Sequence, residues 1–135
     1  MRYQDYEIPD DLCYSKEHEW VRLERKEAVV GLTDFAQKQL HEIVYVEVHK
    51  PGSEVKQFQT MGTVESVKSV SDVFSPVTGK ITLVNKDLSD SPELLNQDPY
   101  GKGWLARINL ADFKKDKGRL FTAEQYAQYL ETMEE

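Results

Sequence analysis

The fold class of this chain depends on one run of residues, Gly62-Thr63-Val64-Glu65-Ser66-Val67-Lys68-Ser69-Val70-Ser71-Asp72. Valine-rich, strand-forming segments stand on both sides of a short polar centre, so the chain is expected to reverse direction near Lys68. A lysine at the tip of a hairpin is ordinarily a solvated charge on an exposed sheet edge. The local pattern therefore predicts a β-hairpin and by itself assigns no chemistry to the lysine.

Short strand-like runs also recur on either side of this hairpin, with turn residues such as Pro51, Gly52, Pro76 and Gly79 between them. The predicted strands are 19–23, 28–32, 43–48, 63–67, 70–74, 79–84 and 104–108. The first two are joined by a charged turn and form a natural hairpin. Many short strands with regular turns predict a mainly β fold, a flattened sandwich or barrel.

Two short helices are expected within the strand pattern. Thr33 is placed to cap a helix over residues 34–40, and Ser91 before Pro92 is typical of an N-cap followed by proline at the first helical position. His41 follows the first helix where left-handed backbone is usual. Because histidine adopts that backbone only at some cost, we interpret it as a solvent-exposed linker residue.

A third helix is expected at the C-terminus, over residues from about 122 to 133. Thr122 and Gln125 have the spacing of a capping box, and Phe121 and Tyr126 occupy the staple positions around it. We expect one domain over residues 1–135, with a core over about 17–110 and an extended lead-in at residues 1–16.

Composition limits the class of function. The 15.6 kDa chain has a formal charge of −7 and a pI near 5.0, which argues against a nucleic-acid surface or an anionic membrane surface. No run approaches the length of a membrane span. The single cysteine, Cys13, cannot form an internal disulfide, and the acidic N-terminal segment has no signal or transit signature. We therefore expect a cytoplasmic protein.

Six segments, the stretch around Lys68 and five others in the right order, resemble the H-protein family of the glycine cleavage system. The stretch VESVKSVSD around Lys68 is similar to the family's lipoylation hairpin. The others are Ser15–Val21, with the family's "HEW"; Val30–Gln37, similar to "GITDYAQ"; Ile43–Val48, similar to "IVYVEL"; and the pair Phe74–Gly79 and Asn96–Trp104. The resemblance covers almost the entire chain.

This resemblance implies a two-sheet antiparallel sandwich of the lipoyl/biotinyl-carrier type, a barrel-sandwich hybrid. It implies that lipoate is attached covalently to Lys68, which aligns with the modified lysine. The chain would then be a carrier without catalytic activity of its own. It would shuttle an aminomethyl group from a pyridoxal-phosphate glycine decarboxylase to a tetrahydrofolate-dependent aminomethyltransferase, and dihydrolipoyl dehydrogenase would reoxidise it.

The resemblance also implies roles for residues near the lysine. The loaded arm would fold into a cleft, where Glu19 and Asp72 protect the intermediate by pairing with its ammonium group. An equally open alternative is that Glu19 is only an edge-strand carboxylate. Glu65, Ser66 and Ser69 would help a lipoyl ligase or transferase to recognise the hairpin.

Three residues and one pair depart from the family pattern: His41 stands in place of a usual glycine, Phe35 in place of tyrosine or histidine, Lys80 in place of an acidic residue, and Ser69-Val70 in place of a commoner small pair. They leave open an H-like carrier that serves sulfur-compound oxidation or acyl transfer during lipoate assembly. A biotinyl carrier is less compatible, because valine and serine rather than methionine flank Lys68. An enzyme is also disfavoured, because the three histidines are scattered and are best explained as surface or strand residues. A binding module with an unmodified lysine is the remaining alternative.

Overall fold

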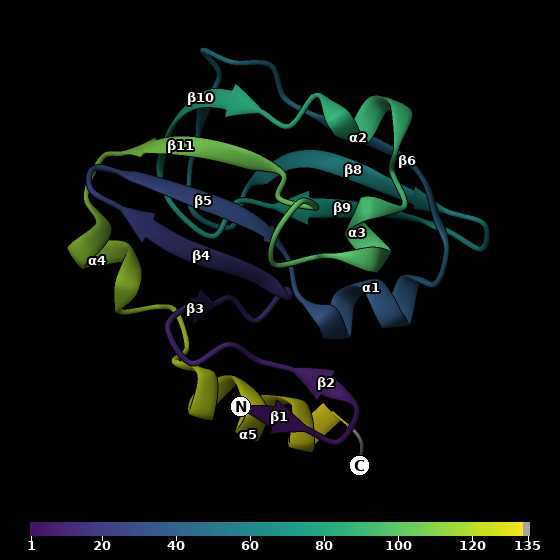
Figure 1. Cartoon of the computed structure of the whole chain (residues 1–135). Coiled ribbons are helices and arrows are strands. Elements are labelled where there is room, and N and C mark those ends of the chain that lie inside the picture. The colour runs from purple at the N-terminus through teal and green to yellow at the C-terminus, as the bar shows by residue number, and fades with distance from the viewer. Residues whose placement is uncertain (134–135) are drawn as a thin grey trace.

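The computed structural model describes residues 1–133 and contains two antiparallel sheets that face each other, with short helices around them (Figure 1). The strands are β1 (Arg2–Tyr3), β2 (Tyr6–Glu7), β3 (Cys13–Tyr14), β4 (Glu19–Glu24), β5 (Glu27–Leu32), β6 (Ile43–Val48), β7 (Glu54–Val55), β8 (Thr60–Ser66), β9 (Val70–Phe74), β10 (Gly79–Val84) and β11 (Ala106–Leu110). The helices are α1 (Asp34–Leu40), α2 (Asp87–Asp90), α3 (Leu94–Gln97), α4 (Phe113–Lys117) and α5 (Ala123–Met133).

The larger sheet has the strand order β3-β4-β5-β11-β10-β7, and the smaller one has the order β6-β8-β9. The predicted two-sheet antiparallel sandwich is therefore confirmed. β6, β9 and β10 begin and end where the sequence pattern places them, whereas β8 starts at Thr60 and ends at Ser66. β11 covers 106–110 rather than 104–108, and Leu105 donates its amide to the Val30 carbonyl of β5 just before the strand begins.

Buried side chains form two apolar clusters, one on each face of the β4–β5 hairpin. Neighbouring residues such as Trp20 and Val21 belong to different clusters, because successive side chains of a strand point to opposite faces. The cluster between the sheets includes Val21, Ala28, Val30, Met61, Val64, Val73, Ile81 and Ile108. The second includes Ile8, Leu12, Trp20, Val29, Tyr126 and Leu130. Segments near both termini therefore contribute buried side chains to the second cluster.

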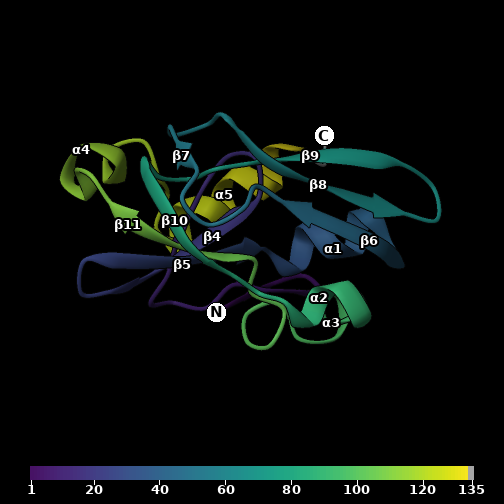
Figure 2. The same ribbon diagram turned by 90° about the horizontal axis from the view of Figure 1, so that it is seen from above.

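The smaller sheet keeps its outer face open to solvent. Tyr45 pairs with Glu65, and Glu65 pairs with Val70, so the three residues form one row across β6, β8 and β9. All three are exposed. The β8–β9 hairpin projects at one end of the molecule and α4 lies at the other, as both ribbon views show (Figures 1 and 2).

The helix predictions are confirmed in part. Thr33 caps α1 by accepting the Ala36 amide at 3.1 Å, as expected. The predicted cap at Ser91 is wrong: α3 begins at Leu94, and Ser91 contributes only its backbone carbonyl to the Leu94 amide. The short helix α2 was not predicted, because four residues are too few to show a helical period. Among residues 1–133, no helix is both long and apolar enough to cross a membrane.

The β1–β2 hairpin and α5 lie together at the β3 edge of the larger sheet (Figure 1). The capping box of α5 is confirmed, since the Gln125 side chain accepts the Thr122 amide at 3.0 Å and Thr122 Oγ1 accepts the Gln125 amide at 3.2 Å. The Phe121 ring lies 5.1 Å from that of Tyr129. An extended lead-in at residues 1–16 is wrong, because β1 and β2 form a small hairpin there.

Candidate functional site

Lys68 lies at the tip of the β8–β9 hairpin, in a turn whose backbone is held by Ser66. The Ser66 hydroxyl oxygen, on a side chain only 5% exposed, accepts the amides of Lys68 at 3.2 Å and of Ser69 at 3.1 Å. The Ser66 amide in turn donates to the Ser69 carbonyl at 2.8 Å. The Lys68 side chain is exposed, and its ammonium has no hydrogen-bond or ion-pair partner within residues 1–133. Lys68 thus presents a free amine on an ordered turn.

The residues beside the lysine differ in what they offer a partner. Val67 and Val70 are 62% and 64% exposed, which is unusual for branched apolar side chains. Glu65 and Ser69 are also exposed, so both can contact an enzyme that approaches the tip. Ser66 cannot, because its hydroxyl is used inside the turn. The structure therefore separates the three residues predicted for ligase recognition into two surface residues and one that shapes the turn.

A cleft of about 350 Å³ lies between the two sheets on the β9 side. Its lining residues come from the start of β4, the end of β5, α1, β8 and β9. They are Glu17, His18, Glu19, Leu32, Phe35, Ala36, Gln39, Leu40, Val64, Ser71, Asp72, Val73 and Phe74. Ser71 follows Lys68 by three residues, a distance of about 10 Å along an extended strand. A lysine side chain lengthened by a lipoyl group spans more than this distance, so an arm on Lys68 can reach the cleft.

Glu19 is almost fully buried in this cleft, with 1% of its surface exposed. Its Oε1 accepts the Ser15 hydroxyl at 2.5 Å, and its Oε2 accepts the Phe74 amide of β9 at 3.2 Å. Burial raises the pKa of Glu19 to about 8, although both hydrogen bonds oppose the shift. The alternative of an edge-strand carboxylate is wrong, because β4 is flanked by β3 and β5. Glu19 is a carboxyl group that a cation in the cleft would return to its ionised form.

Asp72 also lines the cleft, but its side chain is exposed. It lies on β9 opposite Thr63, four residues after Lys68. The two carboxylates predicted for the cleft are therefore brought to the same cavity in different settings. Glu19 is buried and fixed by hydrogen bonds, whereas Asp72 remains in contact with water.

His18 is a cleft residue that sequence reasoning missed. It is half-buried beside Glu19, and its Nδ1 lies 2.8 Å from the hydroxyl of Tyr126, which is itself 2.8 Å from Thr33 Oγ1. Burial lowers the pKa of His18 to about 4, so the ring is neutral at physiological pH. Its interpretation as a surface or strand histidine is wrong. No local signal could have shown this, because Tyr126 lies 108 residues further along the chain.

Of the three residues that depart from the family pattern, only Phe35 lines the cleft. Its ring packs on His18 with centroids 4.7 Å apart. His41 is exposed at the end of α1, as predicted, with a φ of 66°. Lys80 lies on β10 between Glu54 and Asn109, on the other sheet. The cleft therefore has an apolar ring where a hydroxyl or imidazole is common.

A two-sheet sandwich with a free lysine on a tight hairpin beside a cleft defines the class of covalent carrier domains. The model of the family described as "Glycine cleavage H-protein" matches residues 12–133. A glycine cleavage system H protein from Rubrobacter xylanophilus is 48% identical over 128 residues, which are 95% of this chain and 98% of that protein. A glycine cleavage system H protein 4 from Aquifex aeolicus is 47% identical over 98% of this chain and 77% of its own length.

The fold comparison agrees. The crystal structure of a glycine cleavage system H protein from Mycobacterium marinum superposes with a TM-score of 0.83 and 35% sequence identity, covering 90% of this chain and 97% of the other. The chain belongs to the glycine cleavage H-protein family, the lipoyl carriers of that system.

Proposed function

We propose that Lys68 carries lipoate in amide linkage and that this chain shuttles an aminomethyl group within the glycine cleavage system. The observation that carries the proposal is the pairing of an unpartnered amine at Lys68 with a cleft that holds the buried carboxyl of Glu19. Lipoate supplies a dithiolane whose sulfur accepts the aminomethyl group. The protein positions the arm and protects the group that the arm carries.

The residues present fit such an arm. Its hydrocarbon part needs an apolar surface, and six of the cleft residues are large and apolar: Leu32, Phe35, Leu40, Val64, Val73 and Phe74. Its amide link needs an accessible amine, and Lys68 has one on a turn that Ser66 keeps ordered. Acylation removes the charge of Lys68, so entry of the arm into the cleft requires no desolvation of a lysine ammonium.

Glu19 is the residue we assign to protection of the loaded arm, with Asp72 as a second contributor. An ammonium group beside the Glu19 carboxyl favours its ionised form, and the resulting pair is a charge-assisted hydrogen bond in a site with little water. Ser15 and Phe74 hold the carboxyl in place before the arm arrives. Exclusion of water slows hydrolysis of the carried group.

A lipoyl ligase or transferase must select Lys68 among many lysines. We assign direct contact with this enzyme to Glu65 and Ser69, which are exposed beside the tip. Ser66 contributes by shaping the turn. The other proposed partners are the pyridoxal-phosphate glycine decarboxylase, the tetrahydrofolate-dependent aminomethyltransferase and dihydrolipoyl dehydrogenase.

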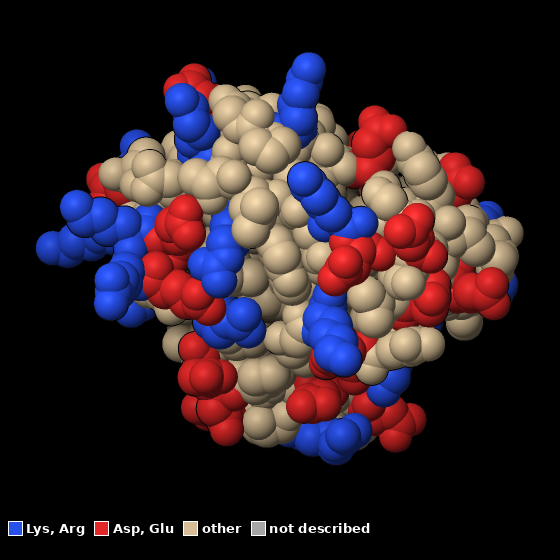
Figure 3. Space-filling model, turned by 45° about the horizontal axis from the view of Figure 1, so that its top comes forward, with Lys and Arg blue, Asp and Glu red and all other residues tan. Residues whose placement is uncertain are grey.

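The distribution of charge supports docking at the lysine end. Acidic side chains predominate towards the end with α2 and β6, whereas basic ones gather where α4 lies, which contains Lys114, Lys115 and Lys117 (Figure 3). A carrier that presents carboxylates around its arm suits partners with basic residues at the entrance to the active site.

One observation favours a second candidate, an H-like carrier of acyl groups in lipoate assembly or of groups in sulfur-compound oxidation. Phe35 makes the cleft more apolar than the family pattern, which suits an uncharged cargo. Glycine–bicarbonate exchange with the purified decarboxylase separates the two candidates. The lipoylated protein should support exchange and Lys68→Arg should not. If the lipoylated protein, with its adduct confirmed by intact mass, supports no exchange, the glycine cleavage assignment is wrong.

A further inference from the structure

The N-terminal strap, defined here as residues 1–8, lies before the stretch of chain that the family model matches. β1 and β2 pair in register, and the Met1 ammonium donates to the Ile8 carbonyl at 2.8 Å while the Ile8 amide donates to the Met1 carbonyl at 2.9 Å. Ile8 is fully buried. The strap is therefore a closed hairpin with an anchored end.

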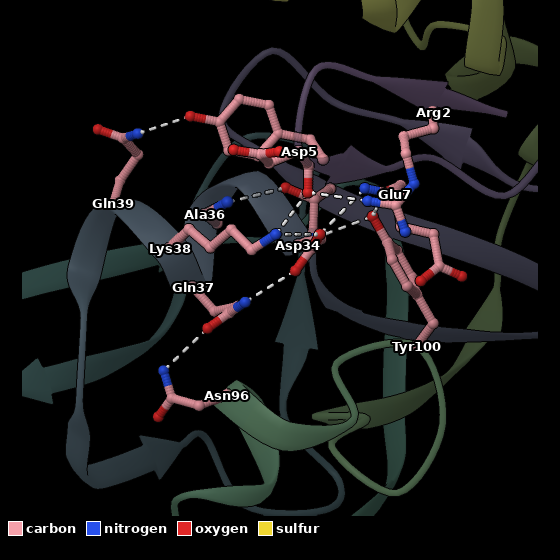
Figure 4. Close-up of polar contacts among 12 residues, drawn as sticks. Arg2, Asp5, Glu7, Asp34, Ala36, Gln37, Lys38, Gln39, Asn96 and Tyr100 are labelled. Atoms are coloured by element: carbon pink, nitrogen blue, oxygen red, sulfur yellow. Dashed lines mark hydrogen bonds and ion pairs between the residues drawn. The ribbon is translucent and has the colours of Figure 1, made fainter.

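The strap packs on α1, the helix that forms one wall of the cleft (Figure 4). The Glu7 amide donates to Asp34 Oδ2 at 3.0 Å, at the first residue of α1. The Lys38 ammonium lies 3.2 Å from the same oxygen and also donates to the Asp5 carbonyl. These contacts join the strap to the first and second turns of the helix.

Asp34 is the centre of this network. The Tyr100 hydroxyl donates to the Glu7 carbonyl at 2.6 Å and accepts the Asp34 amide at 3.0 Å, so a third segment of the chain meets the strap at this point. Partial burial works against ionisation of Asp34, but hydrogen bonds from the Glu7 amide, Gln37 and Lys38 together lower its pKa. Asp34 is thus a charged acceptor that ties the strap to α1.

Aromatic contact connects the strap directly to the cleft. The Tyr6 ring meets the Phe35 ring edge-on at 5.0 Å, and Phe35 lines the cleft together with Ala36, Gln39 and Leu40 of α1. Gln39 also donates to the Tyr6 hydroxyl at 3.4 Å. Loss of the Tyr6 ring would therefore remove a packing contact from Phe35, which forms part of the cleft wall.

The far end of α1 is held in a different way. Asn96 donates to the Gln37 side chain at 3.0 Å (Figure 4). It also donates to the His41 carbonyl at 2.7 Å and accepts the Ile43 amide at 3.0 Å. Asn96 therefore holds the C-terminal end of α1 and the strap holds its first turns. A helix of seven residues has little stability alone, so its position depends on such contacts.

We propose that the N-terminal strap is a positioning element that holds the α1 wall of the cleft, with Tyr6 in the strap and Asp34 at the start of α1 as the positioning residues. It thereby sets how long the loaded arm stays protected. This inference rests on the proposed function, because it assumes that an arm on Lys68 enters the cleft. It assigns to residues 1–8 a role in carrier chemistry, although they are remote from the lysine in the sequence.

The test compares Tyr6→Ala with Tyr6→Phe, which keeps the ring on Phe35, and with Tyr45→Ala, which removes an exposed tyrosine from the smaller sheet. The first readout is amide hydrogen exchange in the unlipoylated protein. Tyr6→Ala should speed exchange of the α1 amides about three- to tenfold, the range expected for loss of one aromatic pair, and leave β4 and β5 unchanged. Tyr45→Ala should match the wild type, and Tyr6→Phe, which loses only the long, exposed hydrogen bond from Gln39, should stay close to it.

The second readout is spontaneous release of ammonia from the loaded protein with no transferase present. Tyr6→Ala should accelerate release by a similar factor, with an unchanged rate of lipoylation at Lys68. Unchanged α1 exchange, or faster exchange with unchanged release, overturns the inference and leaves the proposed function intact. A wild-type protein that is lipoylated but cannot be loaded by the decarboxylase overturns the proposed function, and this inference with it.

Discussion

The tip of the β8–β9 hairpin and the cleft beside it place an ionisable side chain in opposite settings. At the tip, Lys68 is exposed and has no partner within residues 1–133, and only the backbone beneath it is fixed. In the cleft, Glu19 is buried, and both of its oxygens accept hydrogen bonds. The difference separates two tasks of a carrier. Presenting an arm to several enzymes requires a free side chain, whereas keeping its cargo requires a fixed and dehydrated one.

The largest expected effect is at the tip. Lys68→Arg should abolish the lipoyl adduct, because a guanidinium group stays protonated and is not acylated by a ligase that uses an amine. Intact mass after incubation with lipoate, ATP and a lipoate ligase measures the adduct. Lys80→Arg, at an exposed lysine on β10, should be modified like the wild type. An adduct that persists on Lys68→Arg would place the attachment site elsewhere.

The cleft should show the next largest effect, in Glu19→Gln. The folded pKa of Glu19, about 8, lies above its ordinary value of 4.5, so the folded protein holds a proton that the unfolded chain releases. The wild type therefore loses stability as the pH rises from about 4.5 to 8, by about 1.4 kcal/mol per unit and at most about 5 kcal/mol in total. Glu19→Gln is free of this loss.

Urea denaturation at a series of pH values measures this difference. The stability advantage of Glu19→Gln over the wild type should be small near pH 5, grow towards pH 8 and then level off. Glu65→Gln, at an exposed glutamate of β8, should show no such trend. The loaded arm should also release ammonia faster in Glu19→Gln. Parallel pH profiles for wild type and Glu19→Gln would contradict the buried, protonated carboxyl.

A smaller effect is expected for Ser66→Ala, which tests whether the order of the tip matters. The substitution removes the acceptor for the Lys68 and Ser69 amides. The loss of such hydrogen bonds corresponds to roughly a tenfold change in a rate or equilibrium constant. The kcat/KM of lipoylation should fall by about this factor while the fold is kept. Ser89→Ala, at an exposed serine of α2 away from the tip, is the matched control. Equal rates for wild type and Ser66→Ala would show that the ligase does not require an ordered turn.

The smallest expected effect is at His41, at the C-terminal end of α1. His41 has a φ of 66° and a ψ of −147°, a backbone conformation that glycine adopts without strain. His41→Gly should raise the free energy of unfolding by about 1 kcal/mol, as measured in urea. His49→Gly, at an exposed histidine without a positive φ, should lower it slightly. A destabilised His41→Gly would mean that the imidazole makes contacts worth more than the strain.

The sequence predicted secondary structure best where neighbouring residues alone decide it. β6, β9 and β10 follow β-branched runs, and α1 and α5 begin at side chains that cap them within three residues. The β1–β2 hairpin was missed because two-residue strands have no measurable alternation. The order of the turn at Lys68 was also beyond prediction, since the burial of Ser66 depends on the strands around it.

For the candidate site, motif resemblance identified Lys68, Glu19 and Asp72, and the structure brings the two carboxylates to one cleft near the lysine. Their different settings could not be predicted. Glu19 meets its partner Phe74 across 55 residues of sequence, and His18 meets Tyr126 across 108. Strand patterns indicate which face a side chain takes but not which remote segment covers it.

The sequence by itself therefore determined the hairpin, the lysine at its tip and the family, because propensity, capping and motif order are properties of neighbouring residues. Only the tertiary structure decided that Glu19 is buried and protonated, that His18 is neutral, and that the N-terminal strap supports the wall of the cleft. Burial and pKa are sums over every segment that packs around a group, and here those segments come from both ends and the middle of the chain.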